Sequence, residues 1–151
     1  MSTMQDKSQR EDDGYDFTRQ VGHLLRRVHQ RYVAIFQNHI SDPQLTAVQF
    51  TTLCALRDRG PSAQRDLVDY TAVDQATIRG IVARLKARGL VELGPDPEDG
   101  RKVIVMLTSA GAELLDQVIP AARGITELAY GELNPAERVA LDYLLRKMLA
   151  S

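Results

Sequence analysis

Residues 74–107 constrain the fold more than any other part of the chain. They contain a basic amphipathic segment, residues 74–91, then a turn rich in Pro, Asp and Gly, then Arg101-Lys102 and an apolar run. A helix that leads directly into a short hairpin with charged residues at its tip is the layout of a winged helix. This order predicts a mainly α fold with a small β-hairpin wing, and it favours a protein that binds double-stranded DNA.

The charge and the apolar residues of the chain are unevenly distributed. The formal net charge is −1, yet residues 74–91 carry four basic side chains against one acid, Asp74. Cationic surface is therefore concentrated where a DNA-binding helix is expected. No apolar run approaches the roughly 18 to 20 residues that span a bilayer, and the N-terminus lacks the apolar core of a signal peptide. We therefore expect a cytoplasmic protein with no membrane association.

Helical spacing of apolar residues predicts a long first helix. Residues 1–14 are polar and too poor in apolar side chains to offset the entropy of ordering, so we expect a disordered arm there. Within residues 15–44, apolar side chains recur every three or four positions from Tyr15 to Ile40, which predicts an amphipathic helix that ends before Pro43. Its apolar face is suited to dimerisation.

The next part of the chain carries the start and stop signals of three helices. Thr46 and Gln49 form a capping-box pattern, which predicts a helix that ends at the break made by Gly60-Pro61. Ser62 can cap a short helix after this break. Asp74 can cap the following helix after a tight turn, and two helices joined so closely predict a helix-turn-helix.

We call the helix that follows Asp74 and ends at Gly89 the recognition helix. One face carries an apolar stripe at helical spacing, Ile78, Ile81, Val82 and Leu85. The opposite face is small, polar and cationic: Gln75, Thr77, Arg79, Gly80, Ala83 and Arg84. Two apolar runs, residues 90–93 and 103–107, predict strands joined by the turn 94–100. Residues 45–107 would thus form a winged helix-turn-helix DNA-binding lobe.

Residues 108–151 predict two more helices. Thr108 opens the first, and Pro120 inside its apolar pattern predicts a kink or a break. Asn134-Pro135, a cap with proline at the first helical position, predicts the start of the last. A lobe of this size cannot cover the apolar faces of both terminal helical regions, so we expect these N- and C-terminal helices to form a homodimer.

Three separate pieces of sequence, in this order, resemble the multiple antibiotic resistance regulator (MarR) family. They are the segment 74–91, the wing motif Asp96-Pro-Glu-Asp-Gly-Arg101, and Leu107-Thr-Ser-Ala-Gly111. The resemblance covers roughly residues 15–150. It implies a homodimeric winged-helix repressor that releases DNA when a small molecule binds between the dimer and DNA-binding lobes. The wing departs from the family pattern, because Asp99-Gly100-Arg101 stands where Asp-Arg-Arg is usual.

The expected base contacts come from the N-terminal end of the recognition helix, which enters the major groove first. Gln75, Thr77 and Arg79 lie there, and Arg79 can form a bidentate pair with guanine O6 and N7. Gly80 has no side chain to contact a base. Either it permits close approach to the DNA, or a glycine is simply tolerated at this position.

The expected backbone contacts come from the wing and from the middle of the recognition helix. Arg84 and Lys102 are placed for phosphates, and Arg101 for the minor groove or the sugar backbone. In a dimer, two such lobes about 34 Å apart would bind a palindromic site.

Three histidines, His23, His29 and His39, lie in the first helix. No pair of them shares the i, i+4 face of a helical metal site, which argues against a metal. The stretch 22–31 resembles the first helix of MarR-type regulators that respond to aromatic carboxylates. His23 and His29 are therefore candidate ligands of a small aromatic carboxylate or phenolic effector, since a histidine can bind a carboxylate or a phenolic oxygen. The alternative is that they are structural or surface histidines. The effector pocket implied by the family architecture would also include side chains of the second helix, Gln49, Phe50 and Leu53.

The single cysteine, Cys54, excludes an internal disulfide and lies on an apolar helix face, where a small buried thiol is usual. A redox-sensing repressor based on Cys54 is an alternative function, as is a winged helix that binds another protein in place of DNA. No phosphate-binding loop, nucleophile elbow or zinc motif is present, so we expect neither an enzyme nor a cofactor. A hydrolase would require a site assembled from His23, Cys54 and distant acids.

Overall fold

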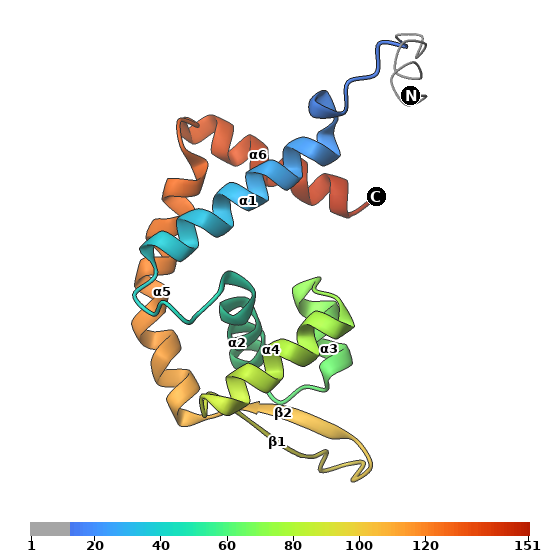
Figure 1. Ribbon diagram of the computed structural model, residues 1–151, viewed down its shortest axis with the longest axis vertical. Helices are drawn as coiled ribbons and strands as arrows, with labels where there is room; N and C mark the ends of the chain where they lie inside the picture. Colours follow the sequence, from blue (N-terminus) through green and yellow to red (C-terminus); the bar gives the residue numbers. More distant parts are fainter. Residues whose placement is uncertain (1–12) are drawn as a thin grey trace, which may run out of the picture. The chain divides into compact units, whose positions relative to one another are not determined.

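The computed structural model describes residues 13–151, which are mainly helical with one two-stranded antiparallel sheet (Figure 1). The elements, in chain order, are η1 (Phe17–Arg19), α1 (Val21–His39), α2 (Ala47–Arg59), α3 (Gln64–Thr71), α4 (Gln75–Ala87), β1 (Val91–Pro95), β2 (Val103–Leu107), α5 (Ser109–Tyr130) and α6 (Pro135–Leu149). This order confirms the mainly α fold with a β-hairpin wing. No helix among these residues is long and apolar enough to cross a membrane. The chain divides within α1 into two compact units, Met1–Arg31 and Tyr32–Ser151.

The first helix starts at Val21, and the prediction that it starts at Tyr15 is wrong. The Asp16 carboxylate accepts hydrogen bonds from the backbone N–H of Thr18, at 2.9 Å, and from its hydroxyl, at 2.6 Å. These bonds cap the 3-10 turn η1, after which Gln20 is extended with ψ 144°. Apolar spacing continues through this turn, so periodicity alone could not detect it. The expected arm falls almost entirely on residues 1–12, outside the described residues.

The start of α2 follows its local sequence signal, but the start of α3 does not. Thr46 N–H donates to Gln49 Oε1 and Gln49 N–H donates to Thr46 Oγ1, each at 3.2 Å, which is the predicted capping box. Ser62 was expected to cap α3. Instead its backbone pairs with Val105 of β2 (N–H to O, 3.0 and 2.8 Å), and Ala63 takes the cap position. A backbone pairing with a distant strand has displaced a local cap.

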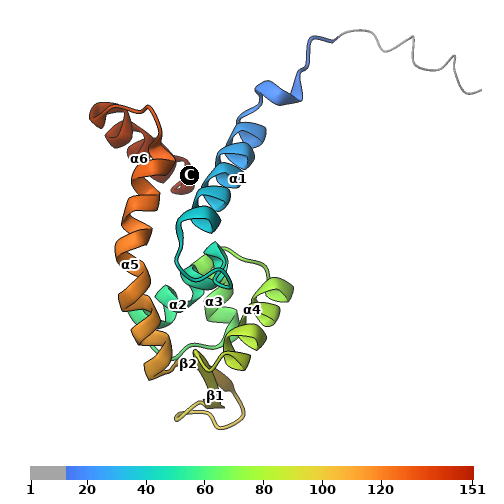
Figure 2. The same ribbon diagram turned by 60° about the vertical axis from the view of Figure 1, so that its left-hand side comes forward.

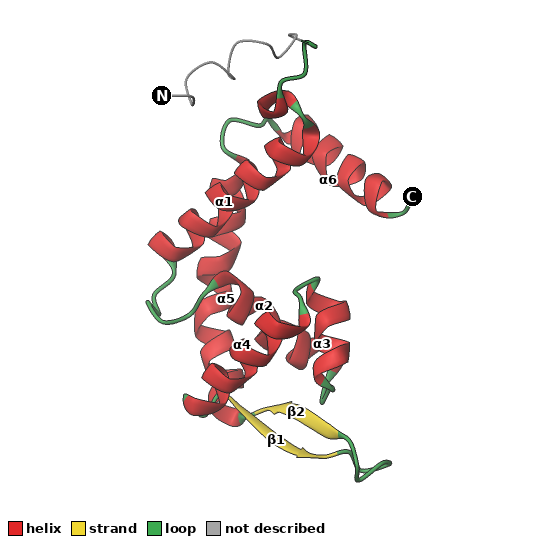
Figure 3. Ribbon diagram, turned by 45° about the vertical axis from the view of Figure 1, so that its right-hand side comes forward, coloured by secondary structure: helices red, strands yellow, loops and turns green. Residues whose placement is uncertain are grey.

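The core of the second unit is built by the end of α1, by α2, α3, α4, the wing strands and α5, and by the segment that joins α1 and α2. Apolar side chains with at most 2% of their surface exposed come from all of these parts: Phe36, Leu45, Leu53, Leu56, Leu67, Ile78, Ile81, Val82, Leu85, Val91, Val105, Leu115, Val118 and Ile125. Figure 2 shows α5 running alongside α2, which it contacts. The wing, β1 and β2, extends from this lobe as a hairpin (Figure 3).

The C-terminal helices begin where the sequence predicts. Thr108 caps α5 and Asn134 caps α6, each through its side-chain oxygen. Of the kink or break predicted at Pro120, the break is wrong, because α5 is continuous from Ser109 to Tyr130. Leu115 and Val118 before the proline and Ile125 after it are buried in the same core, so packing holds both halves of α5 in place despite the missing hydrogen bond.

Candidate nucleic-acid interface

The recognition helix is α4, and its first turn is held by Asp74. The Asp74 carboxylate accepts from Thr77 N–H at 2.9 Å and from the Thr77 hydroxyl at 2.8 Å. These hydrogen bonds lower the pKa of Asp74, so the side chain is a carboxylate at neutral pH. The four apolar residues of the predicted stripe are all buried, with at most 2% of their surface exposed. The orientation expected for this helix is therefore confirmed.

The opposite face of α4 is small along its centre and charged along its edges. At 100° per residue, the positions farthest from the buried stripe are Ala76, Gly80, Ala83 and Ala87. Arg79 and Arg84 flank them and are exposed. Neither arginine forms an ion pair within residues 13–151. Such a face can approach another surface closely while its long cations reach sideways.

The bond to Asp74 restricts what Thr77 can contribute to binding. A hydroxyl has one hydrogen to donate, and Thr77 donates it to Asp74. Its oxygen can still accept, and its methyl group can still make an apolar contact. At a DNA major groove these properties suit a cytosine or adenine amino group, or a thymine methyl.

The wing pairs Val91 with Leu107 at its base and Pro95 with Val103 near its tip. The predicted turn 94–100 is therefore shifted, because Gly94 and Pro95 still belong to β1. At the tip, Asp99 accepts from Arg101 N–H at 3.1 Å through its carboxylate and from Lys102 N–H at 3.0 Å through its carbonyl. These bonds shape the turn and leave the exposed side chains of Arg101 and Lys102 available at the end of the hairpin.

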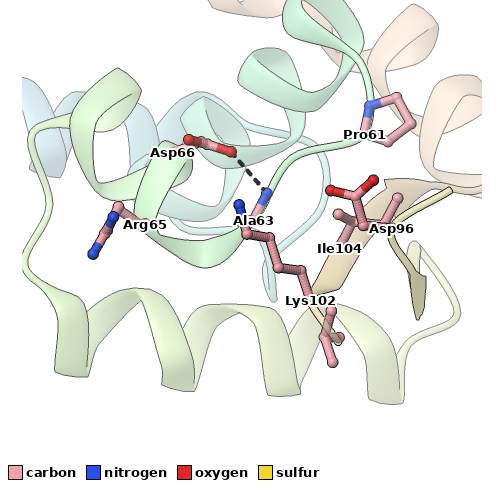
Figure 4. A pocket seen from close by; sticks show the side chains of 8 residues that line it. Pro61, Ala63, Arg65, Asp66, Asp96, Lys102 and Ile104 are labelled. Atoms are coloured by element: carbon pink, nitrogen blue, oxygen red, sulfur yellow. Dashed lines mark hydrogen bonds between the residues drawn. The ribbon is translucent and has the colours of Figure 1, made fainter. Parts of the chain in front are cut away.

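A groove of about 450 Å³ separates the wing from the start of α3. Lys102 and Asp96 from the wing side and Arg65 and Asp66 from α3 contribute to its lining. Figure 4 shows the Lys102 side chain extending toward the start of α3, where Asp66 accepts from Ala63 N–H at 3.0 Å. The groove is lined by as many acidic as basic side chains, so its charge does not favour an anion. Lys102 lines the groove and also belongs to the tip of the wing.

The C-terminal end of α4 is fastened to two other parts of the lobe. The Thr108 hydroxyl donates to Gly89 O at 2.7 Å, and Thr108 N–H donates to Leu90 O at 3.1 Å. Gly111 packs so tightly here that an added Cβ would lie 2.3 Å from Leu90 O. On another side, Arg88 is ion-paired with Asp42 in the segment that joins α1 and α2. Arg88 therefore has an ion-pair partner within the protein, whereas Arg79 and Arg84 form no ion pair within residues 13–151.

One of the two candidate effector residues of α1, His23, lines a hollow in the first unit. Its volume is about 360 Å³, and it is lined by Thr18, His23, Leu24, Arg27, Val28 and Arg31. The His23 ring meets Phe17 edge to face at 5.2 Å. Sequence reasoning found His23 but missed the two arginines, although His23, Arg27 and Arg31 share one face at i, i+4 and i+8. His29 is exposed and is not among the lining residues.

The candidate effector residues of α2 face the core of the second unit. Leu53 is fully buried, and Gln49 is 5% exposed with its side chain engaged in the capping box. The Phe50 ring lies 5.6 Å from the ring of Phe36. In this conformation Phe50 is the member of the group with surface to offer a ligand, because it is only partly buried.

Cys54 is half-buried on α2. Burial raises the pKa of its thiol and outweighs the lowering effect of Arg57. A redox sensor needs an accessible thiolate, whereas this environment favours the neutral thiol. Within residues 13–151, no group of three or more His, Cys, Asp or Glu side chains could hold a metal ion.

The chain is similar to known regulators over most of its length. Residues 44–102 match the MarR family. The HTH-type transcriptional repressor NicR of Pseudomonas putida is 67% identical over 91% of this chain and 87% of its own. The structure of BpsR from Bordetella bronchiseptica, whose DNA binding is regulated by 6-hydroxynicotinic acid, matches with a TM-score of 0.85 and 54% sequence identity. The match covers 91% of this chain and 98% of the BpsR chain. A mutant of MarR from Escherichia coli complexed with operator DNA matches with a TM-score of 0.80 and 29% sequence identity, over 89% of this chain and 99% of the MarR chain.

These matches extend well beyond the three motifs that resemble the family. They agree with the capped recognition helix, its exposed cations and the adjoining wing, and they exclude the enzyme hypothesis. The chain belongs to the MarR family of winged-helix transcription regulators.

Proposed function

We propose that the protein is a transcriptional repressor that binds a palindromic operator in the cytoplasm and leaves it when a small aromatic acid binds. The observation that carries this proposal is the outward face of α4, with Arg79 and Arg84 exposed beside the wing. NicR is a repressor by name, and the DNA binding of BpsR is regulated by 6-hydroxynicotinic acid. The similarity to BpsR supports a hydroxylated pyridine carboxylate as the effector.

The test is a fluorescence-anisotropy titration with the DNA that flanks the protein's own gene. We expect specific binding with a Kd of about 10⁻⁸ to 10⁻¹¹ M at physiological salt. Saturating 6-hydroxynicotinate should weaken binding about 5- to 150-fold, the usual range of allosteric coupling. Benzoate and isonicotinate serve as comparison ligands. Equal affinity for flanking and scrambled DNA would contradict the repressor assignment.

Within this function, Gln75, Thr77 and Arg79 would contact bases, and Gly80 would allow close approach. Replacing Arg79 with Ala should cost about 1 to 3 kcal/mol on the operator and flatten base preference at one position. Arg84, Arg101 and Lys102 would contact the DNA backbone. Replacing Lys102 with Ala should weaken all sequences alike and reduce the salt slope by about one. An Arg79→Ala variant with unchanged base preference would contradict this division of roles.

We propose that the protein acts as a homodimer. Apolar side chains are exposed on α1 (Val21 59%, Val28 59%) and on α6 (Leu144 53%, Met148 52%). Exposed apolar faces on two amphipathic helices support burial against a second copy. Light scattering should give about twice the 16.8 kDa chain mass, and Leu144→Glu should weaken the dimer and its operator binding together. A mass near that of a single chain at micromolar concentration would contradict the proposal.

For the effector, we propose that the hollow beside His23 takes part in binding the carboxylate. Arg27 lines this hollow, and a guanidinium with an imidazole can bind a carboxylate together. His29 is the other candidate on α1 and is tested with them. Leu53 is fully buried and the Gln49 side chain is engaged in the capping box, so neither is part of this proposed site. Release of DNA by 6-hydroxynicotinate should need a higher effector concentration in His23→Ala and Arg27→Gln than in the wild type. Unchanged release in His23→Ala, Arg27→Gln and His29→Ala would exclude this site.

A further inference from the structure

The C-terminal end of the recognition helix is held by an ion pair that spans 46 residues of sequence. Arg88 Nη2 donates to Asp42 Oδ2 at 2.5 Å. The two side chains are only 29% and 16% exposed, less than those of the other ion pairs within residues 13–151. Arg88 is the C-cap residue of α4, and its backbone N–H donates to Arg84 O. A displacement of Arg88 would therefore disturb the last turn of the helix.

Hydrogen bonds within its own turn hold Asp42 in place for the ion pair with Arg88. Its carboxylate also accepts from Gln44 N–H at 2.9 Å, and its carbonyl accepts from Leu45 N–H at 3.1 Å. Burial by itself would raise the pKa of Asp42, but the hydrogen bonds from Arg88 and Gln44 outweigh it and lower the pKa. Asp42 is thus a carboxylate at neutral pH, fixed within the turn that joins α1 and α2.

The same turn is tied to α1. Gln37 Nε2, in the last part of α1, donates to Pro43 O at 3.2 Å. Leu45, which follows Pro43, is fully buried in the core. The turn is therefore anchored independently of Arg88, so it can serve as a fixed support for the end of α4.

We propose that Asp42 is a positioning residue for DNA binding, which holds Arg88 and thereby sets the C-terminal end of the recognition helix against the turn that joins α1 and α2. The proposal rests on the proposed function, since it concerns how α4 is presented to an operator. Arg88 then acts within the protein and makes no phosphate contact.

A positioning role for Asp42 and simple electrostatics predict opposite changes in operator affinity when the charge of Asp42 is removed. Removing an acid close to a DNA-binding helix should tighten binding to a polyanion. If Asp42 positions α4, Asp42→Asn should instead weaken operator binding, on the order of 10-fold, the scale of coupling between contacting residues. The matched control is Asp58→Asn, which removes the same charge from an exposed pair with Arg57.

The experiment measures operator affinity across a range of salt concentrations for Asp42→Asn, Arg88→Gln, the double variant and the control. We expect each single variant to bind about 10-fold more weakly, the double variant to bind no more weakly than either single one, and the salt slope to stay unchanged. Additive losses, a slope reduced by about one in Arg88→Gln, or equal or tighter binding by Asp42→Asn would overturn the proposal. If Asp42→Asn does not fold, the swapped pair Asp42→Arg with Arg88→Asp replaces it and should bind more tightly than Arg88→Asp alone. Failure of the swap to recover affinity would also overturn the proposal.

A second measurement needs no DNA, so it separates this proposal from the repressor assignment. Hydrogen exchange of the amides at the end of α4, residues 84–90, should be faster in Asp42→Asn than in the wild type or in Asp58→Asn. Unchanged exchange would overturn the positioning role even if the wild type bound its operator. Faster exchange in a protein that bound no operator would leave the ion pair as the support of α4 and would refute the repressor function.

Discussion

Replacing Gly80 with Ala should change the stability of the free protein and its affinity for operator DNA in opposite directions. Gly80 lies at the centre of the outward face of α4, and a Cβ built there meets no atom within 4 Å. The free protein should therefore accept the methyl group without strain. Because alanine is the better helix former by about 0.5 to 1 kcal/mol, the free protein should be more stable.

The size of the expected effect differs between the free protein and its complex with DNA. A gain of 0.5 to 1 kcal/mol in a domain of this size should raise the thermal midpoint by about 1 to 4 °C. If the small residues Ala76, Gly80 and Ala83 allow α4 to lie close against DNA, the same methyl group should cost about 1 to 3 kcal/mol in the complex, as in other overpacked contacts. Operator affinity should then fall about 5- to 150-fold while the free protein becomes more stable.

The assays are thermal unfolding without DNA and an anisotropy titration with operator. Gly124→Ala in α5 is the matched control, because a Cβ there also meets no atom within 4 Å. It should raise the thermal midpoint by a similar amount and leave operator affinity unchanged. A more stable Gly80→Ala protein with wild-type affinity would refute the close approach and show that the glycine is merely tolerated.

Other predictions address the support of the recognition helix and the cysteine. Gly111→Ala should destabilise the protein by about 1 to 3 kcal/mol despite the better helix propensity of alanine, because the Cβ would lie 2.3 Å from Leu90 O and 2.6 Å from Leu107 Cδ1; a raised thermal midpoint would contradict the packing. Asp74→Ala should lower the thermal midpoint at pH 7, and the difference from wild type should shrink in acid, since the lowered pKa of Asp74 means that its stabilising effect is lost only as pH falls through that value; a difference independent of pH would count against the cap. Cys54→Ser should leave operator binding unchanged in reducing and oxidising buffers, because burial raises the pKa of the thiol; an oxidant response present only in the wild type would revive the redox alternative.

Local signals correctly predicted the starts of most helices. Thr46, Asp74, Thr108 and Asn134 each accept a hydrogen bond from a backbone N–H three residues ahead. Such caps depend on a few consecutive residues, so they can be identified without knowing the rest of the fold. The same holds for the buried stripe of α4, which needs only the helical period.

Part of the candidate site could not be predicted in this way. The hollow beside His23 includes arginines that the sequence presents as ordinary solvated residues, because only the folded chain shows which side chains surround a space. The family architecture predicts Leu53 as an effector residue, yet Leu53 is fully buried in the core. The outward face of α4 was easier to predict, because one helix supplies all of it.

The amino-acid sequence by itself determined the order of the elements, the capped recognition helix and its cationic outward face, since each depends on residues within one or two turns of one another. Tertiary structure alone decided the pairing of Ser62 with Val105, the continuity of α5 through Pro120, and the fastening of α4 through Arg88 to Asp42 and through Gly89 and Leu90 to Thr108. Those features join residues far apart in the chain. They form only when burial of the common core brings the elements together, and no local pattern encodes that geometry.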